Sequence, residues 1–389
     1  MKEYKKILII VICYFSYASI YIARLNLSMA SPALKEIGVL NSTQLGLLGS
    51  AFSLIFASGR LLNGMLSDRV KPWKMITIGL TVTGINNVVI GFLPPFIAIL
   101  LLWSSNAFAQ SMLWSSILCS ISAIFDKEKT KRVSSLMVTV VAVGNVLGIL
   151  LNMYLINSHG LRWAFIVPGL ITLIFAPMAV LLLFHIPAPA AGSEEKGKGY
   201  FSLLRNRELC LATIPASIHG VMKENVTLWM TVYFTEYFGI NLNESSYFIL
   251  FIPIIGFVGR ILYPVSYRMC HQREHRVSQF AFGGCILAAI VLCMNQSYPF
   301  LAMLCLSVVY AAISLINTSF LAIYPLEFSD GNVASVSGIM DFFTYLGGSI
   351  ASILYGVMIE KMGYFPMFFS WIIISVLAIV ILSKLNKRA

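Results

Sequence analysis

The sequence predicts an all-α polytopic membrane protein with twelve transmembrane helices in two pseudo-symmetric six-helix bundles. Of its 389 residues, 58% are hydrophobic and only 11% are charged, and the mean hydropathy is +0.85. Soluble domains cannot bury that much apolar surface. Apolar runs of about 20 residues, the length that crosses a bilayer, recur along the whole chain, and the two halves of the chain resemble each other. A soluble enzyme or nucleic-acid binder is excluded.

Twelve apolar runs are separated by glycine, proline and clusters of charge. The first six cover residues 7–33, 43–66, 75–94, 96–125, 133–156 and 161–185. The second six cover residues 208–238, 245–267, 277–296, 299–325, 333–358 and 364–384. The rest of the chain suffices for short connections, which leaves no room for a catalytic domain. We therefore expect no enzyme activity and no cofactor, and the seven cysteines show no spacing typical of a metal site.

The distribution of charge predicts the orientation in the membrane. When the runs are threaded alternately, both termini fall on the side that holds about twenty of the Lys and Arg residues, against about three on the other side. Basic loops stay cytoplasmic, so both termini are predicted to be cytoplasmic in a bacterial-type inner membrane. The net charge of +11 follows from this topology, and no nucleic-acid partner is expected.

The middle of the chain predicts the domain division. Residues 187–206 are rich in Pro, Ala, Gly and charge, which is typical of a linker. We expect a cytoplasmic linker there, between bundles formed by residues 1–186 and 207–389. In addition, the GRLL of 59–62 aligns with the GRIL of 259–262. Such a parallel repeat is typical of transporters whose halves rock about a substrate site near the bilayer midplane.

Two motifs carry a resemblance to a known family. The segment Gly64 to Lys74 (GMLSDRVKPWK) resembles the loop between helices 2 and 3 of the major facilitator superfamily, and Arg162 to Phe165 (RWAF) is similar to another of its patterns. The resemblance spans essentially the whole chain and implies the major facilitator fold. It also implies that Asp68 and Arg69 join a cytoplasmic charge network that stabilises the outward-facing state.

Six charged residues lie well inside the apolar runs, away from their ends: Arg24, Arg60, Lys223, Glu224, Arg260 and Asp341. A charge within the bilayer costs a few kcal/mol unless it faces protein or water, so each is a candidate for function. Arg60 and Arg260 occupy matched positions of the two halves, which favours a shared structural or gating role. Lining the substrate path is the alternative.

The first run predicts half of an anion site. Tyr17, Tyr21 and Arg24 are spaced to share one helical face. Lys223 lies at almost the equivalent position of the second half, and two convergent cations favour an anion such as a phosphate monoester or a carboxylate. The alternative is that Arg24 and Lys223 pair permanently with Glu224 and Asp341 as a structural lock.

Further residues resemble the organophosphate:phosphate antiporter family. They are Tyr17, Tyr21 and Arg24; Arg60, which matches a basic residue of the family's helix 2; Gln110 with Trp114; Lys223 with Trp229; and Gly338 to Ser349 (GIMDFFTYLGGS). The resemblance implies that Arg24 and Lys223 bind the anion, that Tyr17, Tyr21, Gln110 and Trp114 shape the pocket, and that a phosphorylated metabolite is exchanged for inorganic phosphate. The expected partners are this solute, phosphate or a proton as coupling ion, and the lipid bilayer around a functional monomer.

The chain departs from that family at three positions. Lys223 replaces an arginine, Gly144 replaces a histidine, and Asp341 is an additional acid. Asp341 lies one turn from Tyr345, so a carboxylate could face the cations and make proton coupling possible. The first alternative function is therefore a proton-coupled symporter of carboxylates such as sugar acids. The second is a transporter-like receptor for sugar phosphates.

His219 lies one turn before Lys223 and is a candidate to line the same pocket. A structural role in helix packing is the alternative for it, as it is for Gln110 and Trp114.

Overall fold

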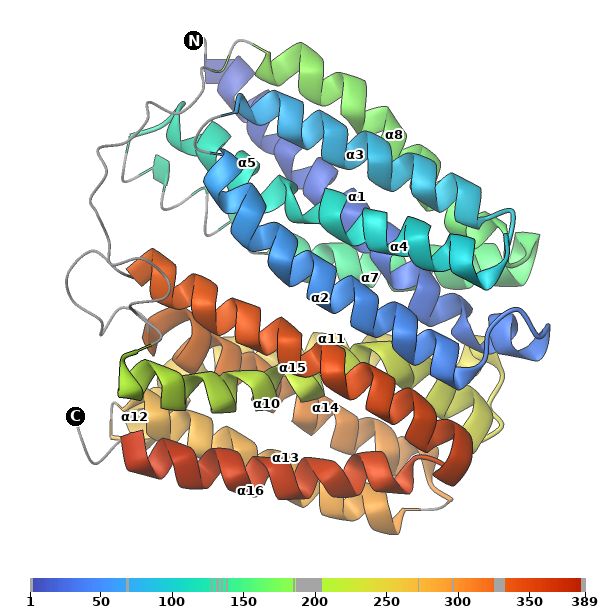
Figure 1. Cartoon of the computed structure of the whole chain (residues 1–389), viewed down its shortest axis with the longest axis vertical. Helices are drawn as coiled ribbons and strands as arrows, with labels where there is room; N and C mark the ends of the chain where they lie inside the picture. Colours follow the sequence, from blue (N-terminus) through green and yellow to red (C-terminus); the bar gives the residue numbers. More distant parts are fainter. Residues whose placement is uncertain are drawn as a thin grey trace. The chain divides into compact units, whose positions relative to one another are not determined.

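The computed structural model describes residues 3–67, 70–126, 129–130, 133, 136–137, 139–184, 186, 205–271, 273–295, 297–324 and 333–385. Within this part of the chain the secondary structure is helical and contains no strand (Figure 1). Asp68 and Arg69 lie outside the described residues, as does most of the expected linker. The expected all-α membrane fold is confirmed.

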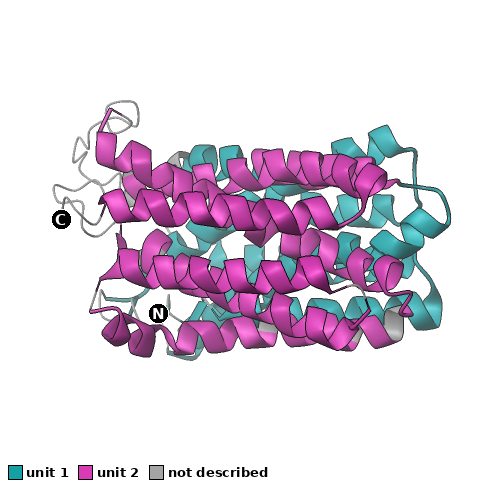
Figure 2. Cartoon of the chain, turned by 90° about the horizontal axis from the view of Figure 1, so that it is seen from below, with its two compact units in different colours: residues 1–40, 55–193 teal, residues 41–54, 194–389 magenta. Residues whose placement is uncertain are grey.

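The chain forms two compact units (Figure 2). Unit 1 comprises residues 1–40 and 55–193, and unit 2 comprises residues 41–54 and 194–389. Helix α2 (Ser42–Ser67) therefore contributes its first part to unit 2 and its remainder to unit 1. The division into bundles at a linker of residues 187–206 stays a prediction.

Unit 1 is built around α1 (Glu3–Glu36), which packs against α7 (Val140–His159) and α8 (Trp163–Leu183). Besides the remainder of α2, its described part also contains α3 (Pro72–Ile90), α4 (Phe96–Ser111) and α5 (Leu113–Ser122), with α3 packed against both α8 and α4. Glycine allows the close approach of α7 to α1, because a Cβ on Gly144 would lie 2.7 Å from the Cβ of Tyr21. A histidine at position 144 would therefore displace Tyr21 or the helix that carries it.

Unit 2 contains seven α-helices and two π-helical segments in its described part beyond residue 205. These are α10 (Arg207–Val232), η1 (Tyr233–Tyr237), α11 (Leu242–Ile261), α12 (Tyr263–Met269), α13 (Glu274–Met294), α14 (Pro299–Ile316), η2 (Asn317–Ile323), α15 (Val333–Met362) and α16 (Phe365–Leu385). Asn206 caps α10 by accepting hydrogen bonds from two main-chain amides of its first turn. Helices α10 and α15 pack closely because Gly220 has no side chain. A Cβ at this position would overlap the main-chain carbonyl of Thr344.

Ten helices of the described residues are long and apolar enough to cross a membrane, or eleven if the bent pair formed by α11 and α12 counts as one span. Helix α10 is absent from both counts, although its 26 residues correspond to about 39 Å of helix. Its lower hydropathy reflects polar residues such as Lys223 and Glu224. Together with α10, these spans are consistent with the twelve expected, and the chain is a multi-pass membrane protein.

Candidate functional site

The aromatic residues expected at the site come together in unit 1. The rings of Tyr17 and Tyr21, one helical turn apart in α1, have centroids 5.3 Å apart and meet edge to face. The indole of Trp114 in α5 lies 5.3 Å from Tyr17. Tyr17 is buried, whereas Tyr21 and Trp114 are partly exposed. Tyr17 and Tyr21 of α1 and Trp114 of α5 therefore form one aromatic surface.

Arg24 and Arg60 both lie against the ring of Phe56. The guanidinium carbon of Arg24 is 5.1 Å from the ring centroid, and that of Arg60 is 5.9 Å from it. Phe56 precedes Arg60 by one turn of α2, so this contact is local, while Arg24 reaches the ring from α1. The sequence analysis did not single out Phe56, because a phenylalanine in an apolar helix carries no signal beyond its spacing from Arg60.

Gln110 lies inside unit 1, with 2% of its surface exposed. Its amide nitrogen and both amide atoms of Asn106, one turn earlier in α4, have no hydrogen-bond partner within the described residues. The amide nitrogens of other interior asparagines are paired, as in the 2.7 Å hydrogen bond that Asn26 donates to Asn87. An unsatisfied buried polar group costs about 1–3 kcal/mol, so Asn106 and Gln110 are suited to receive a polar ligand or water.

In unit 2, Lys223 has two neighbours that the sequence analysis named. Its ammonium nitrogen is 3.2 Å from a carboxylate oxygen of Glu224 and 4.5 Å from the ring centroid of Tyr345 in α15. Gly348 leaves room for the acid, because a Cβ there would lie 2.6 Å from Cγ of Glu224. The contact with Glu224 supports the ion-pair alternative for Lys223, while its 32% exposed side chain keeps it accessible to a ligand.

The remaining candidate residues, His219, Asp341 and Arg260, lie on three different helices. His219 is fully buried, and its Nε2 lies 3.1 Å from the carbonyl oxygen of Ile313, which links α10 to α14 and supports the structural alternative. Asp341 is partly exposed one turn before Tyr345 in α15, and Arg260 is partly exposed in the last turn of α11. The meeting of Arg24 with Lys223 at one site stays a prediction.

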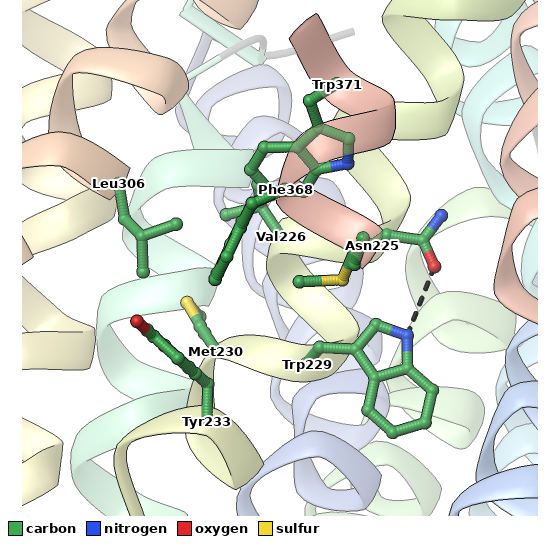
Figure 3. Close-up of a pocket in the computed structure, with 9 residues that line it drawn as sticks. Asn225, Val226, Trp229, Met230, Tyr233, Leu306, Phe368 and Trp371 are labelled. Atoms are coloured by element: carbon green, nitrogen blue, oxygen red, sulfur yellow. Dashed lines mark hydrogen bonds between the residues drawn. The ribbon is translucent and has the colours of Figure 1, made fainter. Parts of the chain in front are cut away.

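Unit 2 also contains a small cavity whose lining includes no charged residue (Figure 3). It lies between α10, η1, α14 and α16, and its lining consists of Asn225, Val226, Trp229, Met230, Tyr233, Leu306, Met367, Phe368 and Trp371. Its polar features include the 3.2 Å hydrogen bond from Trp229 to Asn225. Because no charged side chain lines it, this cavity is unsuited to an anion. Within the described residues no cluster of three His, Cys, Asp or Glu residues could hold a metal ion.

Comparison with known proteins identifies the family. Residues 13–352 match the model of the Major Facilitator Superfamily. The glycerol-3-phosphate transporter of Bacillus subtilis is 24% identical over 412 aligned residues, covering 97% of this chain and 92% of that protein. The phosphoglycerate transporter protein of Salmonella typhimurium is 23% identical, covering 92% of this chain and 83% of that protein.

Two further relatives are similar over less of their length. The membrane sensor proteins UhpC of Salmonella typhimurium and Escherichia coli are each 24% identical over 277 residues. The match covers 65% of this chain and only 62% and 63% of those sensors.

Solved structures show the same fold. An inward-facing, occupied bacterial homolog of the human lysosomal transporter Spinster has a TM-score of 0.80 at 14% identity, covering 100% of this chain and 98% of that one. The D-xylose-proton symporter has a TM-score of 0.76 at 13% identity, covering 99% and 97%. The transporter fold, and the expectation that the protein is not an enzyme, are confirmed by these relationships. The chain belongs to the Major Facilitator Superfamily.

Proposed function

We propose that the protein is a secondary transporter that carries a phosphorylated organic anion across the membrane in exchange for inorganic phosphate. The observation that carries the proposal is the position of Arg24, a cation within a membrane-spanning helix and one turn from Tyr21. The relatives named for glycerol-3-phosphate and phosphoglycerate transport support the choice of a phosphate ester over other anions. The repeat of the two halves supports alternating access.

Each half contributes part of the proposed site. Arg24 binds the phosphate group through bidentate hydrogen bonds, and Lys223 contributes a second, point-like charge. Tyr17, Tyr21 and Trp114 form an aromatic wall for the carbon skeleton. The unsatisfied amide nitrogen of Gln110 donates to a hydroxyl of the solute.

The contact of Lys223 with Glu224 favours a second candidate function, proton-coupled symport of carboxylates. A carboxylate 3.2 Å from the ammonium group competes with an anionic solute, and protonation of Glu224 would release Lys223 to bind it. Asp341 in α15 is a further group able to carry a proton. A sensor without flux is the third candidate, supported by the similarity to UhpC.

The proposed orientation has both termini in the cytoplasm of a bacterial-type inner membrane, with the monomer as the functional unit. The excess of Lys and Arg on one side supports this orientation.

Transport assays in proteoliposomes separate the three candidates. Phosphate exchange predicts that labelled glycerol 3-phosphate enters only vesicles loaded with inorganic phosphate and that a protonophore leaves uptake unchanged. Uptake that needs no internal phosphate and collapses with a protonophore would establish symport. Saturable binding without flux would establish a sensor.

A further inference from the structure

Helices α3 and α4 pack side by side in unit 1 and run in opposite directions (Figure 1). They meet at two places. The side-chain amide of Asn86 donates a 3.2 Å hydrogen bond to the carbonyl oxygen of Leu102. At the other place, a Cβ on Gly79 would lie 2.7 Å from the carbonyl oxygen of Ala109. The two contacts are separated by about 10 Å of helix and therefore enclose one layer of side chains between α3 and α4.

Thr83 and Asn106 occupy this layer. Each lies about one helical turn from both contact residues of its own helix, Thr83 in α3 and Asn106 in α4. Both side chains are fully buried. The hydroxyl of Thr83 and both amide atoms of Asn106 have no hydrogen-bond partner among the residues that the structure describes. Three unsatisfied polar atoms therefore lie in one buried layer.

The hydroxyl of Thr83 differs from those of other buried threonines. A threonine inside a helix can satisfy its hydroxyl by donating to the carbonyl four residues earlier. Thr172 of α8 donates in this way to Pro168 at 2.9 Å, and Thr344 of α15 donates to Met340 at 2.9 Å. Thr83 makes no such bond, so its hydroxyl is available to a partner that lies between the helices.

The chemistry of the layer selects a small neutral partner. A hydroxyl donates and accepts, an amide oxygen accepts, and an amide nitrogen donates. The sequence has no charged residue from Met75 to Phe125, so an ion between α3 and α4 would find no opposite charge on either helix. The close contacts on both sides of the layer exclude a large molecule. Water is the smallest molecule that both donates and accepts, and buried waters typically satisfy such groups.

We infer that one water molecule binds between α3 and α4, held by the hydroxyl of Thr83 and the amide of Asn106. This inference goes beyond the proposed function and does not depend on which solute the protein carries. It also separates two neighbouring residues of α4. Gln110 donates to the solute in the proposed function, whereas Asn106, one turn earlier, binds the water that ties α4 to α3.

The stability of Thr83→Val tests this site, because the two possible environments of the hydroxyl predict opposite signs. Valine keeps the shape of threonine but removes the hydroxyl. If the hydroxyl binds water, the unfolding temperature of the full-length chain in detergent should fall by about 2 °C, the effect of one lost hydrogen bond. If the hydroxyl is simply unpaired, valine should raise the unfolding temperature, which would overturn the inference.

The matched control is Thr172→Val, which removes an equally buried hydroxyl that bonds within its own helix. The unfolding temperature should change less in this control than in Thr83→Val. A second variant, Asn106→Leu, removes the other partner of the water and should also lower the unfolding temperature. Adding Thr83→Val to Asn106→Leu should then cost little more, because the hydroxyl has no bound water left to lose. Fully additive losses would contradict a shared water.

A density map of the purified full-length chain, at a resolution that shows ordered water, distinguishes a bound water from a direct bond between the two side chains. We expect one peak within hydrogen-bond distance of Oγ1 of Thr83 and of the Asn106 amide, and its loss in Thr83→Val. A direct bond between Thr83 and Asn106 with no peak between them would overturn the inference, whatever the stabilities show. This measurement also decides the question if Asn106→Leu fails to fold.

Discussion

The ammonium group of Lys223 lies 3.2 Å from the carboxylate of Glu224, its neighbour in α10. Adjacent residues of a helix do not usually face each other, so this pairing requires space beside the helix. Gly348 of α15 provides that space, because its missing side chain leaves room for the Glu224 methylene groups. The cation of unit 2 is therefore held next to a competing internal anion.

Replacing Glu224 by glutamine should strengthen the binding of inorganic phosphate. The amide has the same shape but no charge, so phosphate no longer competes with an internal carboxylate for Lys223. We expect the Kd for phosphate to fall about fivefold, equivalent to about 1 kcal/mol, as measured by calorimetry. Glu224→Asp keeps the charge and serves as control. An unchanged Kd in Glu224→Gln would show that the carboxylate does not compete with the ligand.

The charge of Lys223 should matter more than its exact geometry. Lys223→Arg keeps the charge and adds a planar group, whereas Lys223→Ala leaves Glu224 beside an apolar residue. Initial rates of exchange in proteoliposomes should be several times higher for Lys223→Arg than for Lys223→Ala. Equal rates for the two variants would show that a cation at position 223 is not required.

The packing of α10 on α15 should tolerate no additional methyl group at Gly220. A Cβ there would overlap the main-chain carbonyl of Thr344, and main chain cannot move aside as a flexible side chain does. Gly220→Ala should lower the free energy of unfolding by about 1–3 kcal/mol, measured by thermal unfolding in detergent.

The control for this prediction is Gly283→Ala in α13. A Cβ at Gly283 meets no atom within 4 Å, and alanine is the better helix former. The control should be at least as stable as the wild-type chain. Equal stability of the two variants would contradict the close packing of α10 and α15.

The first part of α2 should detach from α15 during the transport cycle. Its Ser50 hydroxyl is 2.8 Å from the hydroxyl of Ser349 in α15, and Glu360 of α15 accepts hydrogen bonds from the main-chain amide and the hydroxyl of Thr43. Because α2 continues into unit 1, movement of one unit against the other must bend α2 or detach residues 42–54 from α15.

A cross-link between α2 and α15 tests whether this contact must open. In a chain whose seven native cysteines are replaced, Ser50→Cys with Ser349→Cys should form a disulfide under mild oxidation. Oxidation should stop exchange, and a reductant should restore it, while each single cysteine variant remains active throughout. Full activity of the cross-linked chain would show that transport does not require this contact to open.

The sequence predicts the helical membrane fold well, and each predicted apolar run overlaps a helix of the structure. It also predicts the shared surface of Tyr17, Tyr21 and Trp114, since helical spacing alone places the two tyrosines on one face. The π-helical segments η1 and η2 were not predicted, because their irregular hydrogen bonding has no clear sequence pattern.

Other features of the site depend on contacts between distant segments. Phe56 and Gly348 resemble any other apolar or small residue in an apolar helix, and only their positions beside Arg24 and Glu224 make them informative. The sequence also left His219 with two alternatives. The hydrogen bond between His219 and the Ile313 carbonyl favours the structural role. Ile313 lies 94 positions further along the chain, so helical spacing in the sequence could not reveal this contact.

The most direct test of the central claim is the exchange of external glycerol 3-phosphate for phosphate trapped in proteoliposomes, measured for the wild-type chain and for Arg24→Ala. The account predicts rapid exchange by the wild-type chain and none above protein-free vesicles for Arg24→Ala, with the same unfolding temperature within a few degrees. Exchange by Arg24→Ala at the wild-type rate would contradict it, because the phosphate group would then be bound without its principal cation.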